Sequence, residues 1–509
     1  MLHSKEYNMS DAFDALKARV EEVTSIKQVI AVLDWDMQTQ LPPGAADARG
    51  RHLSVMARLG HDMATAPETQ RLMQAASAEV KDAPYDSDEA SLIRTGSRDL
   101  EKELKIPSDL VADLTRETTL AHGIWAQARA ESNFKAFAPA LKRILDLKKR
   151  QADCIGYSGH IYDALLDEYE PGLKTADVDA IFVGLRADLV PLVAAIRAKL
   201  DMVSDAVLHR EYDEARQKEF GEMVVRKFGY DFNRGRLDPS VHPFTTSFSR
   251  DDVRITTRYD RNFLNVALFS IFHEAGHAIY EQGIGASLEG TLLADGASLG
   301  VHESQSRLWE NLVARSRGFW MHFYPILQGY FPEALGSIEL ETFYRAINHV
   351  DPTQVRVEAD EATYNLHIML RFDLEKDLLA GTLKVDDLPE AWNAKSRDYL
   401  GVVPPNDRLG VLQDVHWSAG LIGYFPTYSI GNLLSVQLLD KAIETHPSIP
   451  VDIARGEFGT LLGWLRESIH RHGRKFMPQE LVRRATGAPL GSAAYMRYLK
   501  AKYSEIYAL

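Results

Sequence analysis

The sequence contains a single cysteine, Cys154, among its 509 residues. One thiol cannot form an internal disulfide, which excludes a small secreted domain held together by disulfides. We therefore expect a protein of a reducing, cytoplasmic compartment. The residues from Met1 to Met9 carry charge and lack an apolar stretch, so we expect no signal peptide there.

A long uninterrupted apolar run is also missing. The nearest approach extends from Trp417 to Leu439, where Pro426, three glycines and several polar residues interrupt it. Such a segment is more typical of a buried core or a cleft lining than of a membrane helix.

Basic residues are fewer than acidic ones: 58 Lys and Arg stand against 72 Asp and Glu, which gives a net charge of −14. We therefore expect neither nucleic acid nor a membrane as a partner.

Helical periodicity dominates the rest of the chain, without an internal repeat or a low-complexity tract. Apolar residues recur every three or four positions over many long segments. The predicted helices cover residues 11–33, 45–65, 86–104, 108–131, 134–155, 175–200, 303–324, 340–348, 358–379, 430–445 and 495–507. These segments predict a mainly α protein. We treat residues 1–509 as a single domain, in which two helical lobes flank a deep central cleft.

The segment His273-Glu274-Ala275-Gly276-His277 carries the clearest chemical signal. Residues four apart on an α-helix lie on one face, so both imidazoles can bind one metal ion while Glu274 lies beside it. The pattern can arise by chance, usually on an exposed helix. Here the flanking residues are apolar nearly all round, so the helix is expected to be buried, where polar side chains need partners. A zinc ion would supply that partner, and Glu274 could then activate water.

A catalytic zinc normally has three protein ligands and one open position. Gly283 stands where the extended motif of metzincins has its third histidine, so that class is excluded. Glu281 would string all three donors along one helix, and we expect it to be a solvated carboxylate near the helix end. Glu303 and Glu310, on a helix that follows a glycine-containing loop, could both reach the metal. Spacing alone does not choose between these two.

A threonine- and aromatic-rich region interrupts the helical pattern at about residues 240–260. Phe244–Phe248 and Val253–Tyr259 resemble strands, and Ser249–Asp252 between them resembles a turn. This composition predicts a small β-hairpin just before the motif helix. In a peptidase, an extended edge near the metal can pair with the substrate backbone.

The chain resembles the thermostable carboxypeptidase Taq family of metallocarboxypeptidases over most of its length. The motifs that carry the resemblance, in order, are His242-Pro243-Phe244, Asp252-Val253-Arg254-Ile255-Thr256, His273 to His277, His302-Glu303-Ser304-Gln305, Val355-Arg356-Val357-Glu358-Ala359-Asp360 and Gly410-Val411-Leu412-Gln413-Asp414-Val415-His416-Trp417. The resemblance implies a large helical gluzincin-type peptidase with a small β element near the zinc helix. It implies that His273, His277 and Glu303 bind zinc, with Glu274 as general acid/base. It also suggests a homodimer.

Recognition of a free C-terminal carboxylate favours arginine, whose planar, permanently charged fork binds carboxylates in a bidentate manner. The candidates are Arg254 and Arg356, because the substrate-binding motifs of the resembling family contain both. We expect Asp252 and Asp360 to orient these arginines. Which of the two binds the carboxylate stays open at this point.

Peptide hydrolysis also needs a donor for the oxyanion that forms on the attacked carbonyl. A tyrosine hydroxyl or a protonated histidine is the usual choice. His416, Tyr424 and Tyr428 lie in or beside an uncharged, glycine-containing segment that resembles a cleft lining. We therefore include all three among the catalytic candidates.

The metal motif predicts a zinc hydrolase, and the family resemblance implies a zinc-dependent metallocarboxypeptidase that releases single C-terminal amino acids from peptides with broad specificity. One Zn²⁺ per chain is expected, although Co²⁺ or Mn²⁺ could occupy the same ligands. One alternative is an oligoendopeptidase or dipeptidyl carboxypeptidase of similar helical fold. Another is a non-catalytic helical binding protein with a structural zinc, although such a site has no use for Glu274 as a base.

Overall fold

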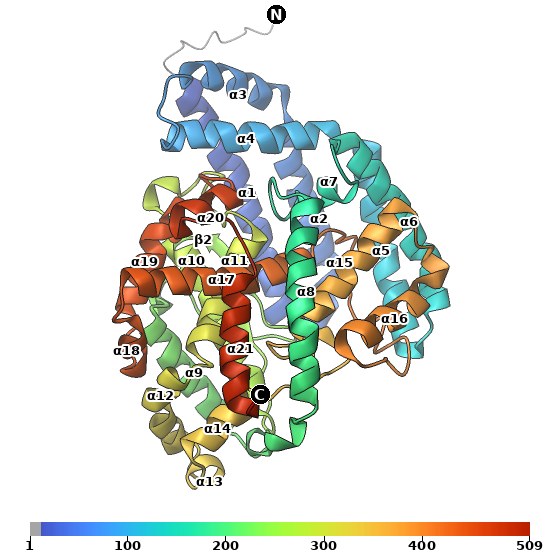
Figure 1. The fold of residues 1–509 in the computed structure, drawn as a ribbon. Helices are drawn as coiled ribbons and strands as arrows, with labels where there is room; N and C mark the ends of the chain where they lie inside the picture. Colours follow the sequence, from blue (N-terminus) through green and yellow to red (C-terminus); the bar gives the residue numbers. More distant parts are fainter. Residues whose placement is uncertain (1–11) are drawn as a thin grey trace, which may run out of the picture.

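The computed structural model describes residues 12–509. The segment Met1–Met9, for which we expect no signal peptide, lies outside the described residues. Most of the described chain is helical, which confirms the prediction of a mainly α protein (Figure 1). Within residues 12–509, no helix combines the length and the apolar character needed to cross a membrane.

The α-helices of the first half are α1 (Ala12–Thr39), α2 (Ala46–Thr65), α3 (Pro67–Glu79), α4 (Asp88–Lys105), α5 (Ser108–Glu131), α6 (Phe134–Ile155), α7 (Tyr162–Leu166), α8 (Thr175–Arg197), α9 (Glu214–Phe228) and α10 (Leu264–Gly283). Those of the second half are α11 (Leu299–Arg307), α12 (Arg317–Tyr330), α13 (Pro332–Leu335), α14 (Leu340–Ile347), α15 (Tyr364–Ala380), α16 (Leu388–Leu400), α17 (Pro426–Thr445), α18 (Ile449–Ala454), α19 (Gly459–Ser468), α20 (Pro478–Thr486) and α21 (Ala493–Tyr507). A π-helical segment, η6 (Leu308–Val313), continues α11.

Three predicted helices differ clearly from the observed ones, the first because α1 continues to Thr39 instead of ending at Leu33. The expected helix 303–324 breaks after η6, because the Ser316 side chain accepts a hydrogen bond from the Phe319 N–H and starts α12. The expected helix 358–379 begins only at Tyr364. There the Asp360 carboxylate accepts hydrogen bonds from the N–H groups of Ala362 and Thr363, which holds a turn ahead of α15.

The predicted hairpin is present as β2 (Thr245–Ser249) and β3 (Asp252–Thr257), which pair in antiparallel fashion. A third strand, β1 (Leu237–Pro239), was not predicted; it pairs in parallel with the other edge of β3. With three residues, β1 is too short for an alternating pattern to reveal. The sheet packs against α10, and α1 contacts β2, so the hairpin lies beside the motif helix.

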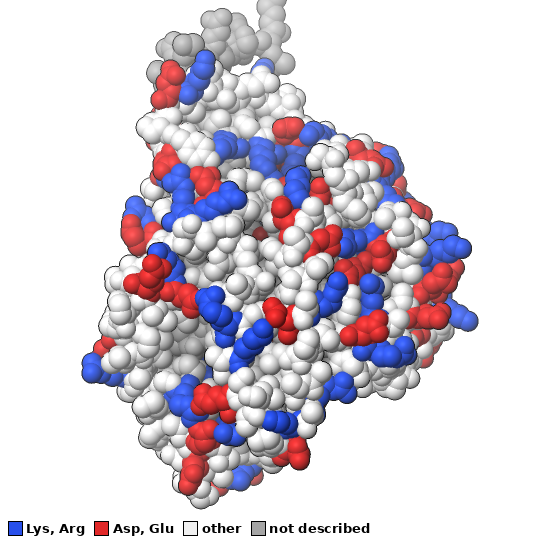
Figure 2. Space-filling model, viewed as in Figure 1, with Lys and Arg blue, Asp and Glu red and all other residues white. Residues whose placement is uncertain are grey.

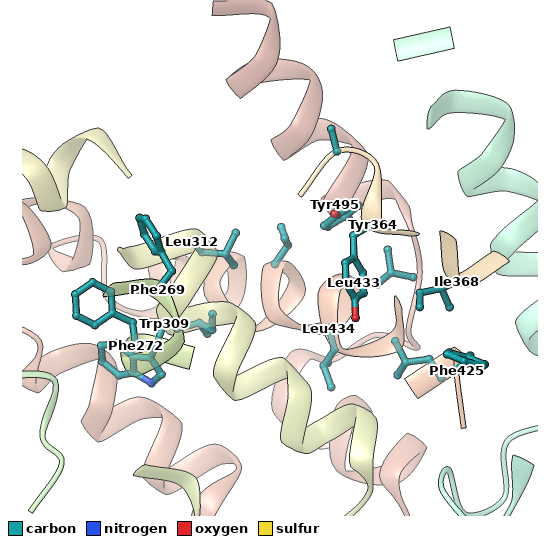
Figure 3. Close-up of a cluster of buried hydrophobic side chains, with 14 of the residues drawn as sticks. Phe269, Phe272, Trp309, Leu312, Tyr364, Ile368, Phe425, Leu433, Leu434 and Tyr495 are labelled. Carbon is teal, nitrogen blue, oxygen red and sulfur yellow. The ribbon is translucent and has the colours of Figure 1, made fainter. Parts of the chain in front are cut away.

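A large core runs from α5 to α21, and Figure 3 shows part of it, where Phe272, Trp309, Leu433 and Tyr364 are buried. Helices α10, α11 and α17 lie at the centre of the molecule in Figure 1. Helix α21 packs against both α8 and α17. Acidic and basic side chains are interspersed over most of the face that these helices present (Figure 2).

Helices α1, α3 and α4 form an N-terminal layer with a small core of its own, which includes Leu16, Leu72 and Met73. A cavity of about 370 Å³ lies along the boundary between this layer and the main body, and it is lined by residues of both. None of the site residues predicted above lines it. The division into two lobes around a central cleft stays a prediction.

Candidate active site

Glycines allow the helices that carry the motif residues to approach closely. A Cβ on Gly276 of α10 would lie 2.6 Å from the Ser306 Cα and 2.7 Å from the Gln305 carbonyl oxygen, both in α11. A Cβ on Gly431 of α17 would lie 2.5 Å from the Cβ of Glu303. Helix α11 is thus held between two glycine contacts, and Glu303 faces α10.

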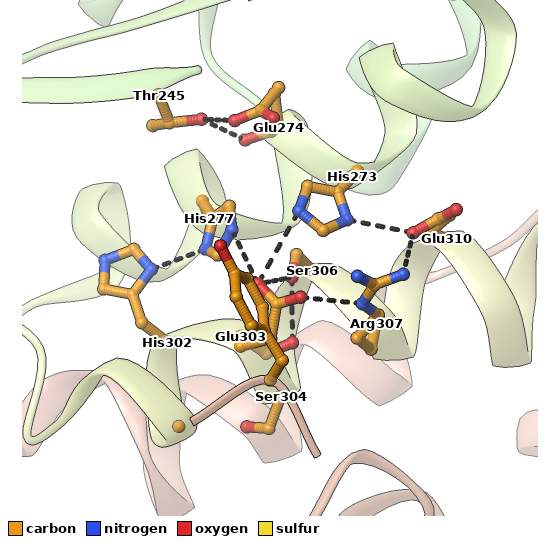
Figure 4. A network of polar contacts seen from close by, with 12 residues as sticks. Thr245, His273, Glu274, His277, His302, Glu303, Ser304, Ser306, Arg307 and Glu310 are labelled. Carbon is orange, nitrogen blue, oxygen red and sulfur yellow. Dashed lines mark hydrogen bonds and ion pairs between the residues drawn. The ribbon is translucent and has the colours of Figure 1, made fainter. Parts of the chain in front are cut away.

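Three potential metal ligands converge at this helix crossing (Figure 4). One donor atom each from His273, His277 and Glu303 lies within 4.8 Å of the others. The Nε2 atoms of His273 and His277 lie 3.7 and 3.4 Å from the same Glu303 oxygen, Oε2. Burial lowers the pKa of His277 to about 3, so its imidazole is neutral, which is the form that binds metal. Two imidazoles and one carboxylate are a donor set that suits zinc.

The far nitrogen of each histidine has a partner of its own. His273 Nδ1 lies 2.9 Å from Glu310 Oε2, and His277 Nδ1 lies 2.6 Å from His302 Nδ1. His302 Nε2 in turn lies 2.7 Å from Glu281 Oε1. If His302 donates to Glu281, its Nδ1 accepts from His277 and leaves the His277 Nε2 lone pair free for a metal.

Glu310 and Glu281, the other candidate ligands from the sequence, therefore form hydrogen bonds with His273 and His302 instead of facing the metal site. The expectation that Glu281 is solvated is wrong, since the residue is 6% exposed and bound to His302. Glu310 lies on the far side of His273 from Glu303. Sequence reasoning missed His302 in this role, although it lies in one of the family motifs.

Arg307 holds the carboxylates on both sides of His273. Its Nε donates to Glu303 Oε1 at 2.7 Å, and its Nη1 donates to Glu310 Oε2 at 3.3 Å. Glu303 Oε2 is left to face the imidazoles, and the Ser306 hydroxyl, which donates to the Glu303 carbonyl oxygen at 2.8 Å, lies 3.2 Å from it. We did not predict Arg307, although its spacings of four residues from Glu303 and three from Glu310 are those of helical ion pairs.

The Glu274 carboxylate lies apart from the ligand cluster and contacts the hairpin. The Thr245 hydroxyl donates to Glu274 Oε2 at 2.7 Å and lies 2.9 Å from the Glu274 carbonyl oxygen. Burial raises the pKa of Glu274, while the neighbouring His273 charge and the Thr245 hydrogen bond act against this rise. A buried carboxylate with a raised pKa, fixed by one hydroxyl, has the properties of a general base.

His416, Tyr424 and Tyr428 form one aromatic cluster. The rings of Tyr424 and Tyr428 lie 5.4 Å apart, and His416 Nε2 lies 3.4 Å from the Tyr428 hydroxyl. Burial, together with the nearby charge of Glu303, raises the pKa of both tyrosines, so their hydroxyls keep their protons. Burial lowers the pKa of His416 to about 4, so this donor is a neutral imidazole rather than the protonated one expected.

Arg254 lies on the hairpin and is paired with Asp252, as expected. Its Nε and Nη2 donate to the two oxygens of Asp252 at 2.9 and 2.8 Å. The guanidinium lies 4.4 Å from the ring of Trp35 in α1 and 4.8 Å from that of Phe248. Its side chain is 20% exposed, against 5% for that of Arg356.

Arg356 is buried, with 4% of the residue exposed. Its Nε and Nη2 donate to Asp414 Oδ1 at 3.1 and 2.8 Å, and its Nη1 donates to the Tyr364 hydroxyl at 2.7 Å. The expectation that Asp360 orients Arg356 is therefore wrong: Asp360 caps the turn before α15, and Asp414 takes that role. The guanidinium carbon lies 5.0 Å from the Tyr428 ring, so Arg356 adjoins the aromatic cluster.

A helical fold that brings His273, His277 and Glu303 together, with the buried Glu274 on the same helix as both histidines, defines a metal-dependent hydrolase. A family model described as carboxypeptidase Taq (M32) metallopeptidase matches residues 15–503, and the chain belongs to this family. The resemblance inferred from the motifs is thereby confirmed. The chain is a peptide hydrolase that acts as a metallocarboxypeptidase, and its family implies a divalent metal ion.

Named relatives and a solved structure agree with this assignment. The chain is 40% identical to thermostable carboxypeptidase 1 of Thermus thermophilus over 97% of this chain and 99% of the relative. It is 37% identical to carboxypeptidase 1 of Bacillus subtilis over 98% of each. The crystal structure of an M32 carboxypeptidase from Deinococcus radiodurans R1 superposes with a TM-score of 0.95 at 42% identity, and covers 98% of this chain and 100% of that one.

Proposed function

We propose that this metallocarboxypeptidase uses one zinc ion per chain, held by His273, His277 and Glu303, and releases single C-terminal amino acids with broad specificity. The observation that carries the proposal is the convergence of one donor atom from each of these residues within 4.8 Å, with both Nε2 atoms near the same Glu303 oxygen. The hydrogen bonds at Nδ1 of His273 and His277 support the proposal, because they fix both rings with Nε2 directed toward Glu303.

Zinc at these ligands would polarise the substrate carbonyl and make water acidic enough to attack at neutral pH. Glu274 accepts the proton of the attacking water on its carboxylate and then passes it to the leaving amine. Thr245 holds the Glu274 carboxylate in one orientation and, by stabilising the ionised form, keeps it ready to accept a proton. The exposed fraction of Glu274 is only 6%, so bulk water competes little for that proton.

The aromatic cluster is proposed to stabilise the oxyanion. Tyr424 and Tyr428 keep their protons because burial raises the pKa of both hydroxyls, so each can donate one hydrogen bond. His416 contacts the Tyr428 hydroxyl and can orient it. Which tyrosine donates to the reacting carbonyl is decided by comparing kcat of Tyr424→Phe and Tyr428→Phe.

Arg356 and Arg254 are proposed to bind the C-terminal carboxylate from two sides. The edge of Arg356 formed by Nε and Nη2 is occupied by Asp414, and Nη1 also donates to Tyr364, so only the remaining N–H groups of its Nη1–Nη2 end would face the substrate beside Tyr428. Arg254 is oriented in the same way by Asp252 and is more exposed. Loss of a bidentate contact should reduce the preference for free carboxylates over amides in Arg356→Lys and Arg254→Lys alike.

Product analysis tests the activity. The zinc-loaded protein is incubated with peptides that carry a free or an amidated C-terminus, and the fragments are identified by mass. Single amino acids released from the free acids alone are expected. Dipeptides would indicate a dipeptidyl carboxypeptidase, internal cuts an oligoendopeptidase. Chelation should abolish activity while the far-ultraviolet circular dichroism is retained, since unfolding on chelation would point to a structural zinc.

We also propose a cytoplasmic homodimer, on the basis of the single cysteine and the family resemblance. Light scattering tests the dimer, and cell fractionation tests the location. Reconstitution with Zn²⁺, Co²⁺ or Mn²⁺, followed by activity measurement, tests which metals support the reaction.

A further inference from the structure

Helix α21 holds both ends of the segment that carries Arg356. We call residues 350–363 the arginine loop. At its start, the Val350 N–H donates to the Tyr507 hydroxyl at 2.8 Å. Near its end, the Tyr495 hydroxyl donates to the Glu361 carbonyl oxygen at 2.9 Å. Tyr495 and Tyr507 lie near the two ends of α21, so the helix spans the loop.

A buried ion pair strengthens the second attachment. Lys502 of α21 donates from Nζ to Glu361 Oε2 at 2.7 Å, and the two side chains are only 6% and 4% exposed. The Tyr498 hydroxyl contacts the same oxygen at 3.2 Å. Desolvation offsets much of the attraction in such a pair, so its conformational specificity can matter more than its net stability.

Helix α21 also packs against α17. Through this contact, α21 links the arginine loop to the helix that carries catalytic residues. Helix α17 carries Tyr428, and its Gly431 lies against Glu303. Helix α21 therefore sets the position of the loop relative to the tyrosine and the metal ligand. An exopeptidase needs such a fixed separation, because the last peptide bond reaches the catalytic groups only when the terminal carboxylate is held at one distance from them.

We propose that Lys502 is a positioning residue for the substrate carboxylate, acting through Glu361 and the arginine loop on Arg356. The inference rests on the proposed binding of that carboxylate by Arg356. Gln413 and Asp414 hold the backbone N–H and the guanidinium of Arg356 on their own. Loss of Lys502 should therefore loosen the position of Arg356 rather than remove its charge, and the metal ligands should be unaffected.

The test measures binding of one acetylated tetrapeptide, as the free acid and as the amide, to zinc-loaded protein with Glu274→Gln as background. Lys502→Met should lower the preference for the acid about tenfold, a loss typical of slight misplacement. With Glu274 intact, Lys502→Met should lower kcat/KM for the free acid by at least a similar factor, with kcat itself reduced, because a displaced carboxylate also presents the peptide bond off its position. Lys500→Met is the matched control, since Lys500 lies on the same helix but pairs with exposed Asp188.

A second pair of changes covers the case in which Glu361, left buried and unpaired, prevents folding of Lys502→Met. Tyr495→Phe combined with Tyr507→Phe removes two ties without leaving a charge, and should lower the acid preference in the same direction but by less. Zinc content and thermal unfolding are measured for each protein. The positioning role is overturned if Arg356→Lys lowers the acid preference but Lys502→Met, or the double tyrosine variant where Lys502→Met does not fold, leaves it unchanged. An unchanged preference in Arg356→Lys itself overturns the proposed carboxylate site and the inference with it.

Discussion

Replacement of Gly276 by alanine tests whether the helix contact behind the histidine motif sets the metal geometry. The added Cβ would lie 2.6 Å from the Ser306 Cα, whereas ordinary carbon contacts are about 3.5–4.0 Å. Both atoms that it meets first belong to the backbone of α11, so no side chain can rotate away. Helices α10 and α11 must therefore separate by roughly 1 Å, and Glu303 moves with α11.

Two effects follow, and they can be measured separately. Overpacking costs about 1–3 kcal/mol, from which the higher helix propensity of alanine returns about 1 kcal/mol. Zinc sites tolerate ligand displacements of only about 0.2 Å, so we expect a loss of about 10–100-fold in zinc affinity. Each tenfold loss removes about 1.4 kcal/mol of the stabilisation that saturating zinc gives.

The assays are a zinc competition titration with a chromophoric chelator, and thermal unfolding with and without zinc. Gly123→Ala in α5 is the matched control, because no heavy atom lies within 4 Å of the added Cβ. That control should bind zinc as the unmodified chain does and gain up to about 1 kcal/mol in stability. Zinc affinity within twofold of the unmodified chain in Gly276→Ala would refute the reasoning.

Four further predictions concern the site itself. Glu274→Gln should lower kcat by several orders of magnitude yet bind zinc almost normally, and near-normal turnover would contradict its role as the base. His302→Ala should weaken zinc binding about 10–100-fold, because His277 loses the partner that orients it; competition titration measures this, and unchanged affinity counts against it. Activity requires ionised Glu274, whose pKa is raised above 4.5 by burial, so kcat/KM should fall as the pH drops through that raised value. Thr245→Val removes a hydrogen bond that lowers this pKa, so the acid limb of the pH profile should move to higher pH; an unmoved limb would argue against Glu274 as the titrating group.

Patterns within one element were sufficient to predict much of the fold. The 3.6-residue period located most long helices, the four-residue spacing of His273 and His277 put them on one face, and threonine-rich segments located the hairpin. The break after η6 was missed because it depends on one serine side chain. Strand β1 was missed because its pairing with β3 is a tertiary contact.

Roles that depend on how helices face one another could not be predicted in the same way. Glu303 and Glu310 are seven residues apart and share a helix face, so spacing could not separate a ligand from a residue that holds His273. Asp360 lies close to Arg356 in sequence, whereas its actual partner Asp414 is distant. Only the assembled helices bring Asp414, or the chain from His277 through His302 to Glu281, into contact.

The π-helical segment after α11 restricts which lengths this part of the chain can have. Glu310 lies within η6, and the wider π-helical turn places its Oε2 atom 2.9 Å from His273 Nδ1. Deletion of Leu308 or Trp309 would bring Glu310 to the sixth position after Glu303 and turn its carboxylate around the helix, away from His273. Insertions and deletions during evolution can therefore accumulate in surface loops, while the span from Glu303 to Glu310 has to keep its residue count.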